Sequence, residues 1–156
     1  MTKLKVDVLD RRQFVIASGA GAAAIIAGFS SAAHATPETA AELIKKLTNS
    51  AKIAEGKIKI DLPEIAENGN TVPVKVSVES PMTADNYVKT VHLVSEGNPG
   101  PEICSFHFTP MSGNANAATR LRLARTQNVV GIAEMSDGTV YMSKTQVKVT
   151  IGGCGG

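Results

Sequence analysis

The chain has 156 residues, a formal net charge of +2 and two cysteines. Its positive charge lies at the amino terminus: residues 1–35 hold four of the 16 Lys and Arg but only two of the 14 Asp and Glu, so residues 36–156 are formally neutral. This neutrality argues against nucleic acid and anionic membrane surfaces as partners, because both select concentrated positive charge. Its size predicts a single domain over residues 36–151.

Residues 1–35 have the form of an export signal. Arg11-Arg12-Gln13-Phe14 leads into residues 13–37, which contain no Asp, Glu, Lys or Arg. Ala33-His34-Ala35 has the A-x-A form of a cleavage site, so we predict cleavage before Thr36 and no membrane attachment afterwards. The paired arginines and the Ala- and Gly-rich stretch indicate twin-arginine export of a folded protein to the periplasm. An uncleaved membrane anchor is the alternative, since the stretch approaches the length of a bilayer span.

The segment that follows predicts a short N-terminal helix over residues 37–53. It is rich in helix-forming residues, and its apolar side chains have the spacing i, i+1 and i+4 that places them on one face: Leu43, Ile44 and Leu47. Thr36 before Pro37 resembles a helix start, with Thr as the cap and Pro in the first turn.

After Gly56 the hydrophobic period changes to two, which is typical of half-buried strands. The clearest runs are Val72, Val74, Val76 and Val78, and then Val147, Val149 and Ile151. Similar short runs occur at 57–62, 87–94, 103–109, 119–125, 128–135 and 139–144.

Turn-prone segments separate these runs, among them Glu67-Asn68-Gly69-Asn70, Gly97-Asn98-Pro99-Gly100 and Ser136-Asp137-Gly138. Six to eight strands with turn signals between them favour an all-β fold, an immunoglobulin-like antiparallel β-sandwich. The last strand leads directly into the glycine-rich end of the chain.

Motifs for independent catalysis are missing from the sequence. It has no C-x-x-C pair, no phosphate-binding loop and no paired carboxylates that stand out as an acid/base dyad. His92 and His107 each sit alone within a strand, and we interpret them as strand-face residues, not as metal ligands or catalytic bases. We therefore expect no cofactor, no metal and no enzymatic activity of the chain's own.

Cys104 lies within a predicted strand. It shares parity with Phe106 and Phe108, and two phenylalanines mark that face as the core, so we predict a buried and chemically quiet thiol. The alternative is a disulfide between Cys104 and Cys154, which requires the end of the chain to fold back onto the sheet.

The chain ends Gly152-Gly153-Cys154-Gly155-Gly156, which places one thiol among four glycines. Because glycine has no side chain to pack, we expect a flexible carrier arm over residues 152–156 that reaches roughly 10 Å beyond Ile151. An exposed thiol is a liability in an oxidising compartment unless the protein uses it. We predict covalent attachment at Cys154, with Gly152, Gly153, Gly155 and Gly156 as its arm. A frayed terminus with an accidental cysteine is the alternative.

This ending, the twin-arginine signal and several internal segments carry a family resemblance. The segments are Phe106-His107-Phe108-Thr109-Pro110, Thr119-Arg120-Leu121-Arg122-Leu123-Ala124, Gln127-Asn128-Val129-Val130 and Ala133-Glu134-Met135-Ser136-Asp137-Gly138. Together they resemble the SoxY family, the sulfur carriers of periplasmic thiosulfate oxidation, over the whole of residues 36–156. Cys104 departs from the pattern, because we expect the carrier cysteine of that family to be the only one.

The resemblance implies a carrier within a multienzyme system. A c-type cytochrome complex would join Cys154 oxidatively to thiosulfate, a di-manganese hydrolase would release sulfate, and a molybdenum sulfane dehydrogenase would oxidise the sulfur that remains. It also implies a heterodimer with a SoxZ-like subunit that lacks its own signal. The residues agree with a passive carrier, because an ordinary thiol is mostly protonated at pH 7 and no Lys, Arg or His lies nearer in sequence than Lys148.

Two other hypotheses remain open. The terminal Gly155-Gly156 also resembles small cytoplasmic carriers that become thiocarboxylates at the chain end, although export argues against a route that consumes ATP. The second is a non-catalytic immunoglobulin-like module that assembles through a disulfide at Cys154.

Overall fold

The computed structural model describes residues 37–49 and 53–153. In these residues it has one α-helix, α2 (Pro37–Leu47), a short 3-10 turn, η1 (Pro110–Ser112), and nine strands. The strands are β1 (Ile53–Glu55), β2 (Ile58–Asp61), β3 (Ile65–Asn68), β4 (Val72–Val78), β5 (Val88–Ser95), β6 (Glu102–His107), β7 (Ala115–Leu121), β8 (Gln127–Met135) and β9 (Val140–Ile151). The predicted export signal and cleavage site lie outside the described residues, as do Cys154, Gly155 and Gly156.

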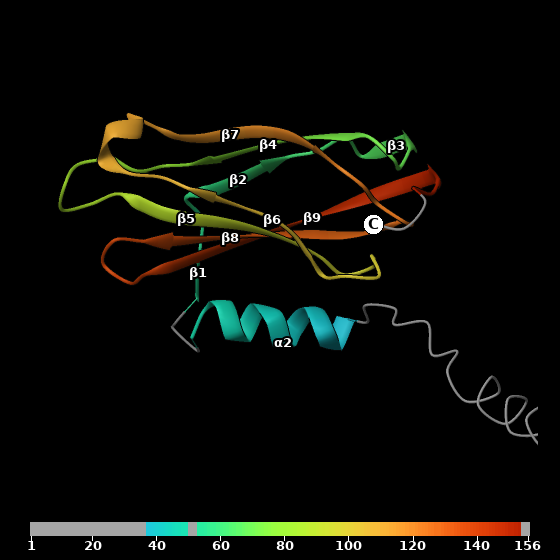
Figure 1. The fold of residues 1–156 in the computed structure, drawn as a ribbon, viewed down its shortest axis with the longest axis horizontal. Coiled ribbons are helices and arrows are strands. Elements are labelled where there is room, and N and C mark those ends of the chain that lie inside the picture. Colours follow the sequence, from blue (N-terminus) through green and yellow to red (C-terminus); the bar gives the residue numbers. More distant parts are fainter. Residues whose placement is uncertain (1–36, 50–52, 154–156) are drawn as a thin grey trace, which may run out of the picture. The chain divides into compact units, whose positions relative to one another are not determined.

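The strands form two sheets that lie in two layers (Figure 1). The larger sheet has the order β1-β9-β8-β5-β6, with β3 also paired to β9, and the smaller has the order β2-β4-β7. The predicted β-sandwich with a short N-terminal helix is confirmed. Its pairing is not purely antiparallel, because β1 and β3 both run parallel to β9. The immunoglobulin-like character stays a prediction.

The hydrophobic core lies between the two sheets. Alternate side chains of β4 are buried, as the period of two in the sequence predicts. They pack with inward-facing side chains of both sheets in two clusters, one built around Val76, Val78, Val88, Val91 and Met135 and the other around Val72, Val74, Leu93, Val129 and Val147. Each fully buried Val or Leu contributes about 1.5–3 kcal/mol relative to an exposed one, so these clusters hold the sheets together.

Helix α2 packs on the outer face of the larger sheet. Its apolar face meets a third cluster on β5, β8 and β9: Val94, Val130, Ile132 and Val140. The predicted face of Leu43, Ile44 and Leu47 is confirmed, and Ala40 in the same cluster is fully buried. The helix ends at Leu47 and not at Ile53. Thr48 Oγ1 donates to Lys45 O, and Asn49 has φ of 47°, a conformation that ends helices.

The strand boundaries differ from the sequence prediction in three places. The runs 139–144 and 146–151 form one continuous strand, β9. Strand β7 begins at Ala115, four residues before the predicted run, because its register is set by pairing with β4 and not by its own hydrophobic pattern. Strands β1 and β3 are three and four residues long, too short for a period to be visible.

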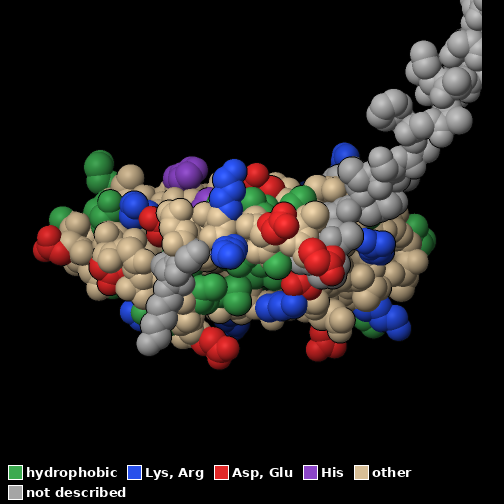
Figure 2. All heavy atoms as spheres, turned by 90° about the horizontal axis from the view of Figure 1, so that it is seen from below, with side chains coloured by type: hydrophobic (Ala, Val, Ile, Leu, Met, Phe, Trp, Pro, Cys, Tyr) green, Lys and Arg blue, Asp and Glu red, His purple; other side chains and the backbone are tan. Residues whose placement is uncertain are grey.

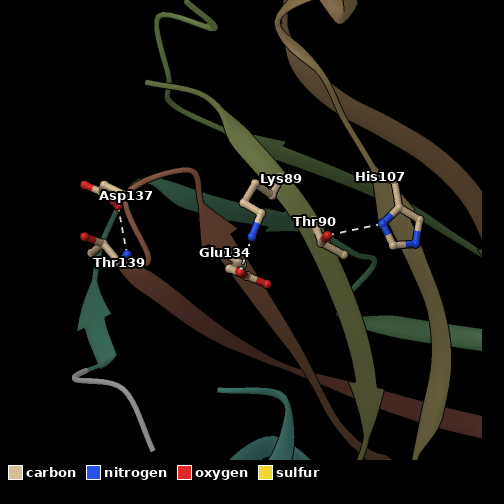
Figure 3. Close-up of polar contacts among 6 residues, drawn as sticks. All are labelled: Lys89, Thr90, His107, Glu134, Asp137 and Thr139. Atoms are coloured by element: carbon tan, nitrogen blue, oxygen red, sulfur yellow. Dashed lines mark hydrogen bonds and ion pairs between the residues drawn. The ribbon is translucent and has the colours of Figure 1, made fainter. Parts of the chain in front are cut away.

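Charged side chains of both signs are interspersed on the face seen in Figure 2, in keeping with the neutrality of residues 36–156. One exposed pair, Lys89 Nζ and Glu134 Oε1 at 2.8 Å, joins β5 to β8 (Figure 3). Exposed pairs of this kind contribute about 0–1 kcal/mol, so the sandwich depends on its core and not on surface charge. Within the described part of the chain, no helix is both long and apolar enough to cross a membrane.

Candidate functional site

Strand β9 connects the sandwich to the predicted carrier arm. Up to Val147, which pairs with Gln127, it is hydrogen-bonded to β8. From Lys148 onwards it pairs with β3 instead, and the last pair is Asn68 with Ile151. The strand therefore extends past the end of β8 and brings Gly152 next to the turn that follows β3.

Gly152 and Gly153 lie against a structure that we call the cradle: Gly69, in the turn between β3 and β4, together with Leu123 and Ala124, which follow β7. Three backbone hydrogen bonds close a ring among these segments. Gly69 N donates to Ile151 O at 2.8 Å, Leu123 N donates to Gly69 O at 2.8 Å, and Gly153 N donates to Leu123 O at 2.9 Å. Gly69 and Gly153 are buried.

There is no room for a side chain at Gly69 of the cradle or at Gly152 and Gly153, which lie against it. A Cβ on Gly69 would stand 2.2 Å from Leu123 O, and one on Gly152 would stand 2.2 Å from Ala124 O. A Cβ on Gly153 would stand 2.8 Å from Gly69 O. Positive φ is confined, among the described glycines, to residues 56, 113 and 138. The cradle therefore needs glycine for close backbone approach and not for a left-handed conformation.

The structure corrects the expectation that the arm makes no packing contacts. Gly152 and Gly153 touch the cradle, and Gly153 is both buried and hydrogen-bonded. The sequence identified the segment around Gly69 as a turn but gave no sign of its contact with Gly153, because that contact joins residues far apart in the chain. The role of Cys154, Gly155 and Gly156 stays a prediction, since they lie outside the described residues.

The sequence predicts a buried Cys104, but in the structure its side chain is only half-buried. It packs with Phe106 and Ile103 against the core cluster that contains Leu93, so the predicted inward face is right. The exposure arises because β6 is the edge strand of the larger sheet. Burial raises the pKa of the Cys104 thiol, and the negative charge of Glu102 raises the pKa further. Both effects favour the protonated thiol, which is a poor nucleophile.

Native alkylation at pH 7 is therefore expected to modify Cys104 more slowly than Cys154. The raised pKa lowers its thiolate fraction at every pH below the ordinary thiol range, and partial burial limits access of the reagent. Iodoacetamide treatment followed by peptide mass spectrometry measures both rates, with urea-unfolded protein as the control. Equal rates for Cys104 in native and unfolded protein would contradict this account.

The two histidines lie on the outer face of the β5–β6 pair. His92 Nδ1 is 2.7 Å from Ser105 Oγ, and His107 Nδ1 is 3.2 Å from Thr90 Oγ1 (Figure 3 shows the second pair). Burial lowers the pKa of His92, so its ring is neutral at pH 7. The described residues contain no group of three or more His, Cys, Asp or Glu that could hold a metal ion. The hydroxyl partner of each ring fits the interpretation of both histidines as strand-face residues.

A protein-family model described as "Sulfur oxidation protein SoxY" matches residues 44–154. The chain belongs to the SoxY family. The match to the SoxY model begins within α2, spans both sheets and the cradle, and runs to Cys154. The match confirms the resemblance to the SoxY family that the sequence segments carry.

Among solved structures, this SoxY-family chain is similar to the sulfur carrier protein SoxY from Chlorobium limicola f thiosulfatophilum. The two have 32% identity and a TM-score of 0.60, over 71% of this chain and 96% of that one.

With superoxide reductases the chain shares the fold and no more. The superoxide reductase (neelaredoxin) from Ignicoccus hospitalis has 21% identity and a TM-score of 0.54 over 60% of this chain and 80% of that one. A superoxide reductase from Thermotoga maritima, itself described as putative, has 17% identity and a TM-score of 0.54 over 66% and 96%. A search among curated proteins gave no match.

Proposed function

We propose that this SoxY-family protein carries sulfur covalently on Cys154 while thiosulfate, or another reduced sulfur compound, is oxidised to sulfate. The observation that carries the proposal is the family match over residues 44–154, which includes the cysteine of the Gly-Gly-Cys-Gly-Gly ending. The similarity to a solved protein described as a sulfur carrier supports it.

The proposed first step joins the Cys154 sulfur to the sulfane sulfur of thiosulfate. The new S–S bond forms with loss of the thiol proton and of two electrons, which a c-type cytochrome complex accepts. Hydrolysis by a di-manganese enzyme then breaks the bond between the sulfane sulfur and the sulfonate, and the products are sulfate and a persulfide on Cys154. A sulfane dehydrogenase then oxidises the outer sulfur to a sulfonate, with three oxygens taken from water and six electrons passed to an electron acceptor. A second hydrolysis releases this sulfonate as sulfate and restores the thiol.

In this scheme the protein is a carrier and the catalysts are its partners. The cysteine's neighbours in sequence are glycines, and glycine supplies no acid, base or charge to activate a thiol. The proposed complex also includes a SoxZ-like subunit as a noncovalent heterodimer partner. Edge strands such as β6 and β7 leave backbone groups that a partner could pair or cover.

We propose the periplasm as the site of this chemistry. The support is the sequence of residues 1–35, with its paired arginines and the Ala33-His34-Ala35 site. On this proposal the exported protein begins at Thr36 and crosses the membrane already folded, which allows a SoxZ-like partner without a signal to travel with it.

Intact-mass measurement of the protein recovered from the periplasm during growth on thiosulfate tests the proposal. The expected mass is that of a chain starting at Thr36, with a fraction carrying one additional sulfur atom or a thiosulfonate group. Peptide mapping is expected to place each addition on Cys154, and treatment with dithiothreitol is expected to remove it.

Three results would overturn the proposal, each in a different way. A sulfur atom found on the Gly156 carboxylate would establish a thiocarboxylate carrier. Obligatory disulfide-linked dimers through Cys154 on non-reducing gels would establish an assembly module. Protein that begins at Met1 would remove the case for a cleaved signal.

A further inference from the structure

We propose that the cradle anchors the base of the carrier arm: it holds Gly153, the residue before Cys154, on the sandwich, so that the arm starts from a fixed point. The inference rests on the proposed function of Cys154. It adds Gly69 and Asn98, both outside the carboxyl-terminal motif, as positioning residues that act through the backbone of Gly153.

The ring of hydrogen bonds fixes the backbone immediately before the cysteine. Leu123 N–H, Gly69 N–H and Gly153 N–H each pair with a carbonyl of another segment, so each segment is held by both of the others. Gly153 is the last donor of the ring and directly precedes Cys154 in sequence. The ring therefore ties the base of the carrier arm to the sandwich.

Leu123 itself is anchored in the core. Its side chain is 0% exposed and packs in the cluster that contains Val72, Leu121 and Val147. Moving its carbonyl, which accepts the hydrogen bond of Gly153, would disturb that packing. Closely packed interiors resist such shifts, so the cradle is tied to the rigid part of the sandwich.

A buried amide network holds the other side of the same segment. Asn98 Nδ2 donates to Arg122 O at 2.8 Å, and Asn98 Oδ1 accepts from Ala124 N at 3.0 Å. The two contacts bracket Leu123. Gln127 Nε2 donates to Asn98 Oδ1 at 2.8 Å, and Gln127 Oε1 accepts from Gly97 N at 2.8 Å. Asn98 is 4% exposed and Gln127 is 6% exposed, so little water competes for these bonds.

The placement also explains why three glycines meet at one point. The backbones approach so closely that a Cβ on Gly69 or Gly152 would have to move away by about 1 Å to reach ordinary contact at 3.4 Å. A shift of that size in a positioned reacting group can lower a rate by roughly a hundredfold. Glycine here allows the base of the arm to lie against the cradle.

Four variants test the proposal: Gly69→Ala, Gly153→Ala, the double variant that combines them, and the matched control Gly100→Ala. Gly100 has nothing within 4 Å of a built Cβ and no positive φ, so its substitution tests the change to alanine alone. If Gly69→Ala lowers the melting temperature enough to unfold part of the sample, Gly152→Ala replaces it, because a Cβ on Gly152 would stand 2.2 Å from Ala124 O.

Two measurements separate positioning from general stability. The first is amide hydrogen exchange at Gly153, expected to be roughly tenfold faster in Gly69→Ala because one hydrogen bond is weakened. The second is thiosulfate-dependent cytochrome c reduction with the purified partner enzymes. Its kcat/KM for the carrier is expected to fall about tenfold to a hundredfold, while alkylation of Cys154 by iodoacetamide stays unchanged.

The double variant gives the decisive comparison. If Gly69 and Gly153 act through one contact, the double variant is expected to lose no more than the worse single variant. If the losses of kcat/KM in the two single variants multiply in the double variant, the proposal is wrong. It is also wrong if Gly69→Ala keeps the wild-type kcat/KM although amide exchange at Gly153 is accelerated. A wild-type protein without any sulfur transfer would instead refute the proposed function, and the exchange experiment would still report on the cradle.

Discussion

Replacing Cys154 with serine is expected to abolish thiosulfate-dependent cytochrome c reduction in a reconstituted system while the protein remains folded. Serine keeps the shape of the side chain, but its hydroxyl forms neither a persulfide nor a thiosulfonate. The exchange of one atom beyond the last strand is expected to change the free energy of unfolding by less than about 0.5 kcal/mol. Thermal unfolding and copurification with the SoxZ-like subunit measure folding and partner binding in the same variant.

Cys104→Ala supplies the matched control for this experiment. Its thiol is half-buried, and the raised pKa keeps it protonated at pH 7, so its removal is expected to leave electron transfer unchanged. The loss of its core contacts is expected to cost about 1 kcal/mol of stability. If Cys154→Ser retained activity and Cys104→Ala lost it, the carrier site would lie on β6 and the proposed role of Cys154 would be wrong.

The parts of the fold that the sequence predicts well are those whose signal is local. The alternating valines of β4 form one buried side, as a period of two predicts. In β9 the predicted alternation holds at Val147, which is buried, but Val149 is half-buried and Ile151 is exposed. The turns after β3, β5 and β8 are marked by Asn, Gly, Pro or Asp. In the last of these turns, Asp137 Oδ1 accepts a hydrogen bond from Thr139 N at 2.8 Å (Figure 3).

The parts that the sequence misses are set by contacts between distant segments. Strands β1 and β3 exist because β9 offers them a parallel partner, and neither has a hydrophobic period of its own. Strand β7 reads Ala-Asn-Ala-Ala-Thr-Arg-Leu, and its seven pairs with β4 decide where it begins. Local propensity is a weak guide wherever pairing decides the structure.

The same limit applies to the candidate site. Glycine in a sequence signals either backbone freedom or the absence of a Cβ, and composition does not distinguish the two. The sequence predicts a flexible arm at Gly152 and Gly153, but both lie in close contact with the cradle. Only the contact with Gly69 and Ala124 makes the difference visible, and that contact joins three separate regions of the chain.

Asn98→Ala is expected to have the largest effect on stability among the substitutions considered. It removes three hydrogen bonds and leaves Arg122 O and Ala124 N without their side-chain partner. At about 1 kcal/mol for each bond, the loss is about 3 kcal/mol. For a domain of this size that corresponds to a fall in melting temperature of roughly 10 °C.

Urea and thermal unfolding measure this loss, with Asn116→Ala as the matched control. Asn116 is an exposed residue of β7, so its substitution is expected to change stability by less than about 0.5 kcal/mol. Equal stability of the two variants would show that the amide network does not hold the segment around Leu123.

Below its melting temperature, Asn98→Ala is also expected to speed amide exchange at Gly153. The carbonyl of Leu123 accepts the hydrogen bond of Gly153, and without the Asn98 side chain this carbonyl is held from one side only. Normal exchange at Gly153 in this destabilised variant would separate the network from the cradle, and the core packing of Leu123 would then be sufficient to hold the base of the arm.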